Sequence, residues 1–136
     1  MNNAELILLA LEARKLSYSP YSGFSVGAAL LCKDGTVYMG CNIENAAFSP
    51  TNCAERTAFF KAVSEGKREF LKIAVVGGNS SEDFPLDYCP PCGVCRQVMN
   101  EFCSPEFEII TAKTQDDFKV LTLSELLPES FDKREV

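Results

Sequence analysis

The chain has 136 residues, of which 46% are hydrophobic and 24% are charged, so it can bury one core and is not expected to be disordered. Its net charge is −6 and it has no lysine or arginine cluster, which disfavours DNA and RNA as partners because nucleic acids bind chiefly through phosphate neutralisation. No apolar run approaches the roughly 20 residues that span a bilayer. We therefore expect no membrane partner, a cytoplasmic location, and a single domain over residues 1–136 with a charged tail at 129–136.

The first third of the chain is expected to form a helix followed by a hairpin. Asn3 can cap a helix that continues to about Leu16, with apolar residues along one stripe. Residues 25–33 and 36–41 have the alternation of strands, and Asp34-Gly35 between them supplies the turn. These segments predict an antiparallel pair of strands after the first helix.

The rest of the chain alternates helices with strands. The predicted ranges are a helix at 53–65 ended by Gly66, a strand at 71–77, a loop at 79–91, a helix at 92–102, strands at 108–112 and 118–121, and a short helix from Ser124 to Pro128. This order predicts an α/β fold in which helices cover both faces of one sheet, a three-layer α/β/α sandwich.

Seven cysteines and the absence of histidine form the most informative pattern in the chain. Cys53 and Glu55 are separated by one alanine at the start of one predicted helix, and Cys92 and Cys95 begin another. Three thiolates are soft ligands for zinc and leave the fourth tetrahedral position open for water, which is typical of a catalytic site. The odd number and the clustering of the cysteines favour reduced thiols over a disulfide framework.

Two linked motifs match the signature of nucleobase deaminases, a cysteine or histidine, one residue and a glutamate, followed later by Pro-Cys-x-x-Cys. They are Cys53-Ala54-Glu55 and Pro91-Cys92-Gly93-Val94-Cys95. Together with the stretches 40–47, 52–58 and 91–98, they make the chain resemble the small bacterial cytidine deaminases from about Pro20 to Pro128. The resemblance implies a mixed five-stranded sheet between helices, with Zn²⁺ at two adjoining helix N-termini.

The activity implied by this resemblance is zinc-dependent hydrolytic deamination of cytidine and 2′-deoxycytidine to uridine and 2′-deoxyuridine, with release of ammonia, in pyrimidine salvage. The acidic net charge agrees with an uncharged nucleoside as substrate. Deamination at C4 needs N3 protonated, hydroxide delivered and the amine protonated, and we expect Glu55 to move these protons. Partial burial should raise the pKa of Glu55 toward the working pH. The implied assembly is a homotetramer with shared active sites.

Further residues are assigned to the substrate or to the ligands. Asn42 and Glu44 follow the second strand, and in an extended segment their side chains point to one side; the resemblance assigns both to the ribose hydroxyls. It also suggests that the Arg56 guanidinium hydrogen-bonds the sulfur ligands, offsetting the formal charge of −1 on a zinc bound by three thiolates. The remaining substrate contacts implied are Phe24 against the base, the Ala54 backbone N–H on the base carbonyl, and Phe131 from an adjacent subunit.

The sequence leaves alternatives open. Cys89-Pro90-Pro91-Cys92 has the spacing of a dithiol redox motif, but redox chemistry does not account for Glu55. Cys89, Cys92 and Cys95 make a run used in iron–sulfur proteins, but those proteins have another cysteine three residues on, whereas the next one here is Cys103. A deaminase of a cytosine-containing nucleoside antibiotic would use the same zinc motif. A non-enzymatic zinc-stabilised module would need a fourth protein ligand, such as Cys89. Phe48 and Pro90 depart from the family pattern, in which tyrosine and Ser or Thr are common.

Overall fold

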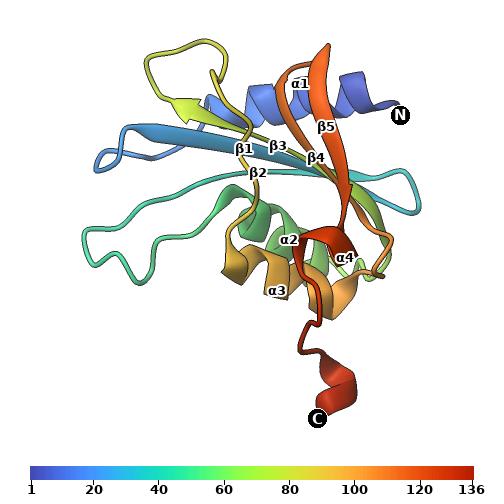
Figure 1. The fold of residues 1–136 in the computed structure, drawn as a ribbon. Helices are drawn as coiled ribbons and strands as arrows, with labels where there is room; N and C mark the ends of the chain where they lie inside the picture. The colour runs from blue at the N-terminus through green and yellow to red at the C-terminus, as the bar shows by residue number, and fades with distance from the viewer.

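The computed structural model describes residues 1–136, apart from the side chain of Glu135. Figure 1 shows one sheet with α1 on one face and α2, α3 and α4 on the other. In chain order the elements are α1 (Asn3–Arg14), β1 (Phe24–Cys32), β2 (Val37–Cys41), α2 (Ala54–Ser64), β3 (Phe70–Asn79), α3 (Gly93–Phe102), β4 (Glu108–Thr114), β5 (Asp117–Thr122), α4 (Leu123–Leu126) and the 3-10 turn η1 (Lys133–Glu135). None of the described helices is both long and apolar enough to cross a membrane.

The sheet has five strands in the order β2-β1-β3-β4-β5. β1 is antiparallel to both β2 and β3, β3 and β4 are parallel, and β4 and β5 are antiparallel. The parallel pair requires a crossover, which α3 provides. The mixed five-stranded sheet in a three-layer α/β/α sandwich is therefore confirmed.

The core consists of two clusters, one on each face of the sheet. Along β1, Ala28 and Leu30 join the cluster under α2 and α3, whereas Ala29 and Leu31 join the cluster under α1. This separation follows from the pleat, because successive side chains of a strand point to opposite faces. Both clusters are apolar at their centres, so the central strands β1, β3 and β4 are buried on both sides, whereas the edge strand β5 is largely exposed.

Two helix caps differ from the sequence prediction. The N-cap of α1 is Asn2, whose Oδ1 accepts the Glu5 N–H at 2.8 Å, and the predicted cap Asn3 is already helical. The N-cap of α4 is Thr122, which forms a reciprocal capping box with Glu125, whereas the predicted cap Ser124 is the second residue of the helix. In both helices the observed cap is a polar residue close to the predicted one, and it lies three residues before the backbone N–H that its side chain accepts.

Some element ends also differ from the prediction. α1 ends at Arg14 rather than Leu16, because the N–H groups of residues 15–17 turn back to carbonyls three residues earlier. β3 continues to Asn79 rather than residue 77, because its antiparallel partner β1 extends to Phe24, which pairs with Asn79. α4 ends at Leu126, before Pro128.

Glycines let two helices lie directly on the sheet. A Cβ on Gly27 would stand 2.0 Å from the Ala10 carbonyl oxygen of α1, and a Cβ on Gly40 would stand 2.4 Å from the Ala54 carbonyl oxygen of α2. Atoms other than hydrogen do not approach so closely without bonding, so each helix backbone occupies the space of a missing side chain. Gly40 therefore sets the height of the N-terminus of α2 above β2.

Candidate metal and active site

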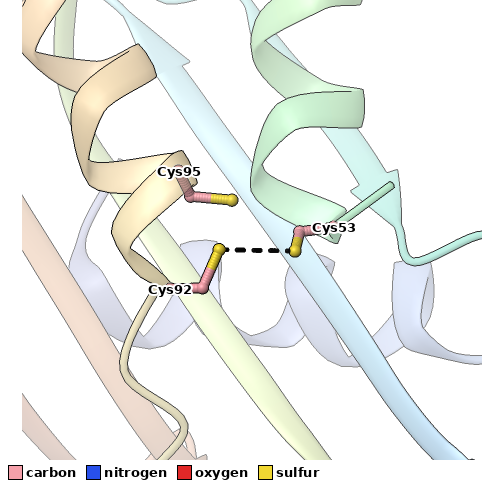
Figure 2. Close-up of side chains that lie close together, drawn as sticks. All are labelled: Cys53, Cys92 and Cys95. Carbon is pink, nitrogen blue, oxygen red and sulfur yellow. Dashed lines mark hydrogen bonds between the residues drawn. The ribbon is translucent and has the colours of Figure 1, made fainter. Parts of the chain in front are cut away.

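Three cysteine sulfurs converge where the N-termini of α2 and α3 meet. Cys53 is the N-cap of α2, Cys92 is the N-cap of α3, and Cys95 lies in the first turn of α3. Their Sγ atoms all lie within 4.8 Å of one another, and Figure 2 shows the three side chains directed into one space. Neither cap side chain accepts a capping hydrogen bond from the backbone of its own helix. The sulfurs thus face one another at helix ends whose partial positive charge favours thiolates.

The donor set fits a zinc ion. Sulfurs about 2.3 Å from a tetrahedral zinc lie about 3.8 Å apart, and the Sγ atoms of Cys53 and Cys92 are 3.7 Å apart. Among the described residues, the group that could hold a metal consists of these three cysteines and does not include Cys89. The protein therefore offers three of the four ligands of a tetrahedral ion.

Arg56 supports the sulfur cluster from α2. One of its terminal nitrogens donates to Cys53 Sγ at 3.3 Å. The pKa of Cys53 is lowered to about 5 by a hydrogen bond with Cys95 and by this guanidinium, while Cys95, which keeps the shared proton, has its pKa raised. The buried Nε of Arg56 has no hydrogen-bond partner within the described part of the chain. A donor thus remains available beside the sulfurs.

Glu55 is a buried carboxyl group next to the cysteines. Its side chain is 4% exposed in the first turn of α2. Burial raises its pKa to about 7, and the negative charge of Cys53 acts in the same direction. A carboxyl group with a pKa near neutrality can both accept and donate a proton at the pH of the cell.

Asn42 lies just beyond β2 and is nearly buried. Its Oδ1 accepts the Val26 N–H at 2.9 Å and the Ser17 hydroxyl, and its Nδ2 donates to the Phe24 carbonyl at 2.8 Å. The amide therefore holds the start of β1, and one of its two N–H groups has no partner assigned by these bonds.

Glu44 contacts the turn that precedes β1. Its Oε1 accepts the N–H groups of Tyr21 at 3.0 Å and Ser22 at 3.1 Å, and its Oε2 accepts the Ser22 hydroxyl. The bond from the Ser22 hydroxyl is the largest cause of its lowered pKa. Glu44 and Tyr21 also line a cavity of about 270 Å³, together with Asn45, Phe48 and Thr51.

Phe24 and Cys89 meet over β3. A Cβ on Gly77 would lie 3.1 Å from Cε1 of Phe24 and 2.7 Å from Sγ of Cys89, so both side chains occupy the space above this glycine. The pKa of Cys89 is raised to about 12, first by burial and then by the charge of Glu55. Cys89 thus lies near the proposed acid–base group as a protonated thiol.

The remaining predicted contacts are Ala54 and Phe131. Ala54 is fully buried as the first residue of α2, where a backbone N–H has no partner within the helix. The Phe131 side chain is 63% exposed, and its carbonyl accepts bonds from Gln97 and Asn100 of α3. Figure 1 shows the C-terminal segment leading away from the sheet. The described contacts do not bring Phe131 to the sulfurs of its own chain.

A larger cavity lies elsewhere and is lined by none of the predicted site residues. It measures about 1110 Å³ and lies between α1 and the loop that follows β3, with Arg14, Tyr18 and Phe84 in its wall. Sequence reasoning also missed Ser17 and Ser22, whose hydroxyls hold Asn42 and Glu44. The chain carries no local signal for these pairings, because the partners are 25 and 22 residues apart.

Comparison with known proteins identifies the family. The model of the cytidine and deoxycytidylate deaminase zinc-binding region matches residues 1–111. The chain belongs to this deaminase family. A cytidine deaminase of Sporosarcina psychrophila is 48% identical over 136 residues, which are 100% of this chain and 96% of the relative. One of Halalkalibacterium halodurans is 51% identical over 131 residues, 96% of this chain and 95% of the relative.

A solved structure supports the same assignment. The crystal structure of cytidine deaminase from Burkholderia pseudomallei has a TM-score of 0.88 and 46% sequence identity, and the match covers 96% of this chain and 100% of that one. The resemblance and the fold class inferred from the sequence are thereby confirmed. As a member of the deaminase family, the protein is an enzyme of the hydrolase type.

Proposed function

We propose that the protein deaminates cytidine and 2′-deoxycytidine hydrolytically to uridine and 2′-deoxyuridine, releasing ammonia in pyrimidine salvage. The observation that carries this proposal is the buried Glu55, with a pKa near 7, directly beside three convergent cysteine sulfurs. Membership of the deaminase family and the names of the relatives support cytidine as the substrate.

Zn²⁺ would be held by Cys53, Cys92 and Cys95. When bound, the ion would supply the Lewis acidity that makes water a nucleophile near neutral pH. Arg56, already bonded to Cys53, would keep the thiolates charged and temper the negative charge of the ligand set.

Glu55 would carry the protons. It would take a proton from the attacking water and deliver it to N3 of the cytosine ring, and then take the second proton from the new C4 hydroxyl and transfer it to the amine as the C4–N bond breaks. A C4–O bond replaces the C4–N bond, so one water is consumed and one ammonia leaves. Burial of Glu55 supports this role because a carboxyl group with its ordinary pKa would be too weak a base and too rarely protonated.

Substrate binding would use residues around the start of β1. The unassigned N–H of Asn42 and the remaining acceptor capacity of Glu44 would bind ribose hydroxyls, Phe24 would contact the base, and the Ala54 N–H would bind the base carbonyl. The small cavity beside Glu44 supports this placement.

The test is incubation with cytidine, 2′-deoxycytidine, CMP and a single-stranded oligonucleotide. We expect the ultraviolet shift of deamination and release of ammonia with both nucleosides only. A higher kcat/KM for CMP or the oligonucleotide would contradict the proposal, and turnover of a cytosine-containing nucleoside antibiotic in preference to cytidine would reassign the substrate.

The ligand set is tested by metal content. Cys53→Ser should lose zinc, because the hydroxyl is a poor replacement for a thiolate, whereas the matched change Cys89→Ser should retain one zinc per chain. Loss of zinc from Cys89→Ser would instead indicate four cysteine ligands and a structural zinc module.

We also propose a cytoplasmic homotetramer in which Phe131 closes over the base bound in a neighbouring subunit. The Phe131 ring is exposed, and it lies on a segment that leads away from its own sheet, which supports a contact with the base bound in a neighbouring subunit. The seven free cysteines support a reducing compartment. Sedimentation of the active enzyme tests the assembly, and a fully active monomer would contradict it.

A further inference from the structure

Ser22 occupies a turn between two segments of the proposed nucleoside site. The turn ends at Gly23, which has φ +66° and donates its N–H to the Ser19 carbonyl at 3.1 Å. The Ser22 hydroxyl donates to Oε2 of Glu44 and accepts the N–H of Phe24 at 3.0 Å. A single hydroxyl thus links the carboxylate proposed to bind ribose to the backbone of the residue proposed to contact the base.

The other backbone group of Phe24 is held from the same side. Its carbonyl accepts Nδ2 of Asn42 at 2.8 Å, and Oδ1 of Asn42 accepts the N–H of Val26. Both polar backbone groups of Phe24 are therefore bonded, one directly and one through Ser22, to the two residues proposed for the ribose. The sugar contacts and the base contact form one hydrogen-bonded unit.

We propose that Ser22 is a positioning residue that fixes Glu44 and Phe24 relative to each other for nucleoside binding. The proposal rests on the proposed function and deepens it by adding a residue that need not touch the substrate. A hydroxyl donates and accepts at once, so alanine at this position breaks both bonds. Glu44 keeps the two backbone donors at Oε1, and the Phe24 N–H is left to water.

The position of Ser22 separates this role from a purely structural one. Ser22 is exposed and belongs to neither core cluster, so its loss should leave the fold and the sulfur cluster intact. Binding groups must be held within about 0.5 Å of the productive geometry, so a small displacement of Glu44 and Phe24 is enough to weaken substrate binding. The effect is therefore expected in KM and not in kcat, melting temperature or zinc content.

The experiment compares Ser22→Ala, Ser22→Thr and the control Ser81→Ala. Ser81 is also exposed, and its hydroxyl bonds Asn79 at 2.8 Å outside the site. Ser22→Ala should raise KM for cytidine roughly tenfold, as expected for a lost bond to a charged group, with kcat changed by less than about threefold. Ser22→Thr keeps the hydroxyl and should restore KM, and Ser81→Ala should match wild type.

The energetic coupling between Ser22 and Glu44 gives a second readout. If Ser22 acts through Glu44, adding Ser22→Ala to Glu44→Ala should raise KM by less than it does in the wild-type background. Strict additivity, or a wild-type KM in Ser22→Ala, would overturn the proposal.

The Kd for uridine, measured by calorimetry, tests the inference independently of turnover and should rise by the same factor in Ser22→Ala. Wild-type protein that binds uridine but does not deaminate cytidine would contradict the proposed function alone. Wild-type protein that binds no nucleoside would contradict both.

Discussion

The helices on the two faces of the sheet pack against it in the same way, but the polar groups at their ends differ. α1 rests on Gly27 and α2 rests on Gly40, each with its backbone where a side chain would be. At the end of α1, Arg14 gives its donors to carbonyls of Ser25, Asn79, Glu82 and Asp83. At the start of α2 and α3, three thiols face one another and a carboxyl group is buried among them.

Arg14, which is buried, and Arg56, which is half-buried, express this difference. Burial lowers the pKa of Arg14, whose partners are neutral carbonyls. Desolvation also acts on Arg56, but hydrogen bonds to the sulfurs of Cys53 and Cys95 raise its pKa, and its Nε is left without a partner in the described residues. A polar group satisfied by the chain itself is a structural element, whereas charged groups gathered without full protein partners identify a site.

The same change from glutamate to glutamine should lower kcat strongly on one face of the sheet and hardly at all on the other. Glu55→Gln should lower kcat by at least about 10²–10⁴-fold, since an amide cannot accept and release protons, while zinc content stays at wild type. Glu12→Gln, on an exposed residue of α1, should change kcat little. Steady-state kinetics and metal analysis provide the check, and a Glu55→Gln enzyme with a tenth of the wild-type kcat would remove Glu55 from the mechanism.

The metal-free protein should lose stability as pH rises, because of Glu55. Its pKa is about 7 when folded against an ordinary value of 4.5, so the folded state holds more protons between these values. Its contribution is intact below pH 4.5 and is lost as pH rises through 7. Urea unfolding of chelated protein should therefore show Glu55→Gln more stable than wild type at pH 8, by up to about 3 kcal/mol, with little difference near pH 4.5. A constant difference across this range would contradict burial of an ionisable group.

Substitution of Gly27 and Gly40 is the most direct test of whether the two faces of the sheet are independent. Gly27→Ala and Gly40→Ala should each lower the free energy of unfolding by about 1–3 kcal/mol or more, because a helix backbone must move. Only Gly40→Ala should also reduce zinc retention, since α2 carries Cys53. Denaturant unfolding and zinc content of the folded fraction measure both effects. Equal zinc loss in the two variants would show that the faces are not independent.

The smallest effect is expected at the C-terminal segment. Phe131→Ala should raise KM for cytidine by roughly fivefold, the lower end of the loss for one aromatic ring stacked on a base, with zinc content unchanged. Phe84→Ala, an exposed aromatic change beside α1, should leave KM at wild type. Identical KM values in the two variants would contradict a shared site.

The sequence predicts the parts of this molecule that rest on short spacings. Cys53, Glu55, Cys92 and Cys95 are recognisable because metal ligands at helix starts recur at fixed separations. The exact caps of α1 and α4 cannot be predicted in the same way, because Asn2 and Asn3, or Thr122 and Ser124, have nearly the same preference for the N-cap position.

Contacts between distant segments have no such signal. In the sequence Arg14 lies inside the predicted first helix, and its carbonyl partners lie 65–69 residues away except for Ser25. Gly40 is one of eight glycines, and the sequence does not distinguish it from the others, because its role depends on the helix that packs over it. Ser22 and Glu44 are joined only when the turn before β1 folds onto the segment after β2.

The hydrogen bonds of Arg14 also mean that the two parts of the segment between β3 and α3 should differ in how well they tolerate an insertion. Its bonds to Asn79, Glu82 and Asp83 anchor the first part, and Pro85 packs against Gly78. Farther on, Tyr88 is held by Asp117, with Lys113 and Lys119 over its ring. Between these anchors Leu86 is 72% exposed. A peptide tag placed directly after Leu86 should therefore be accommodated, whereas one placed after Ser81 would separate the anchor from α1.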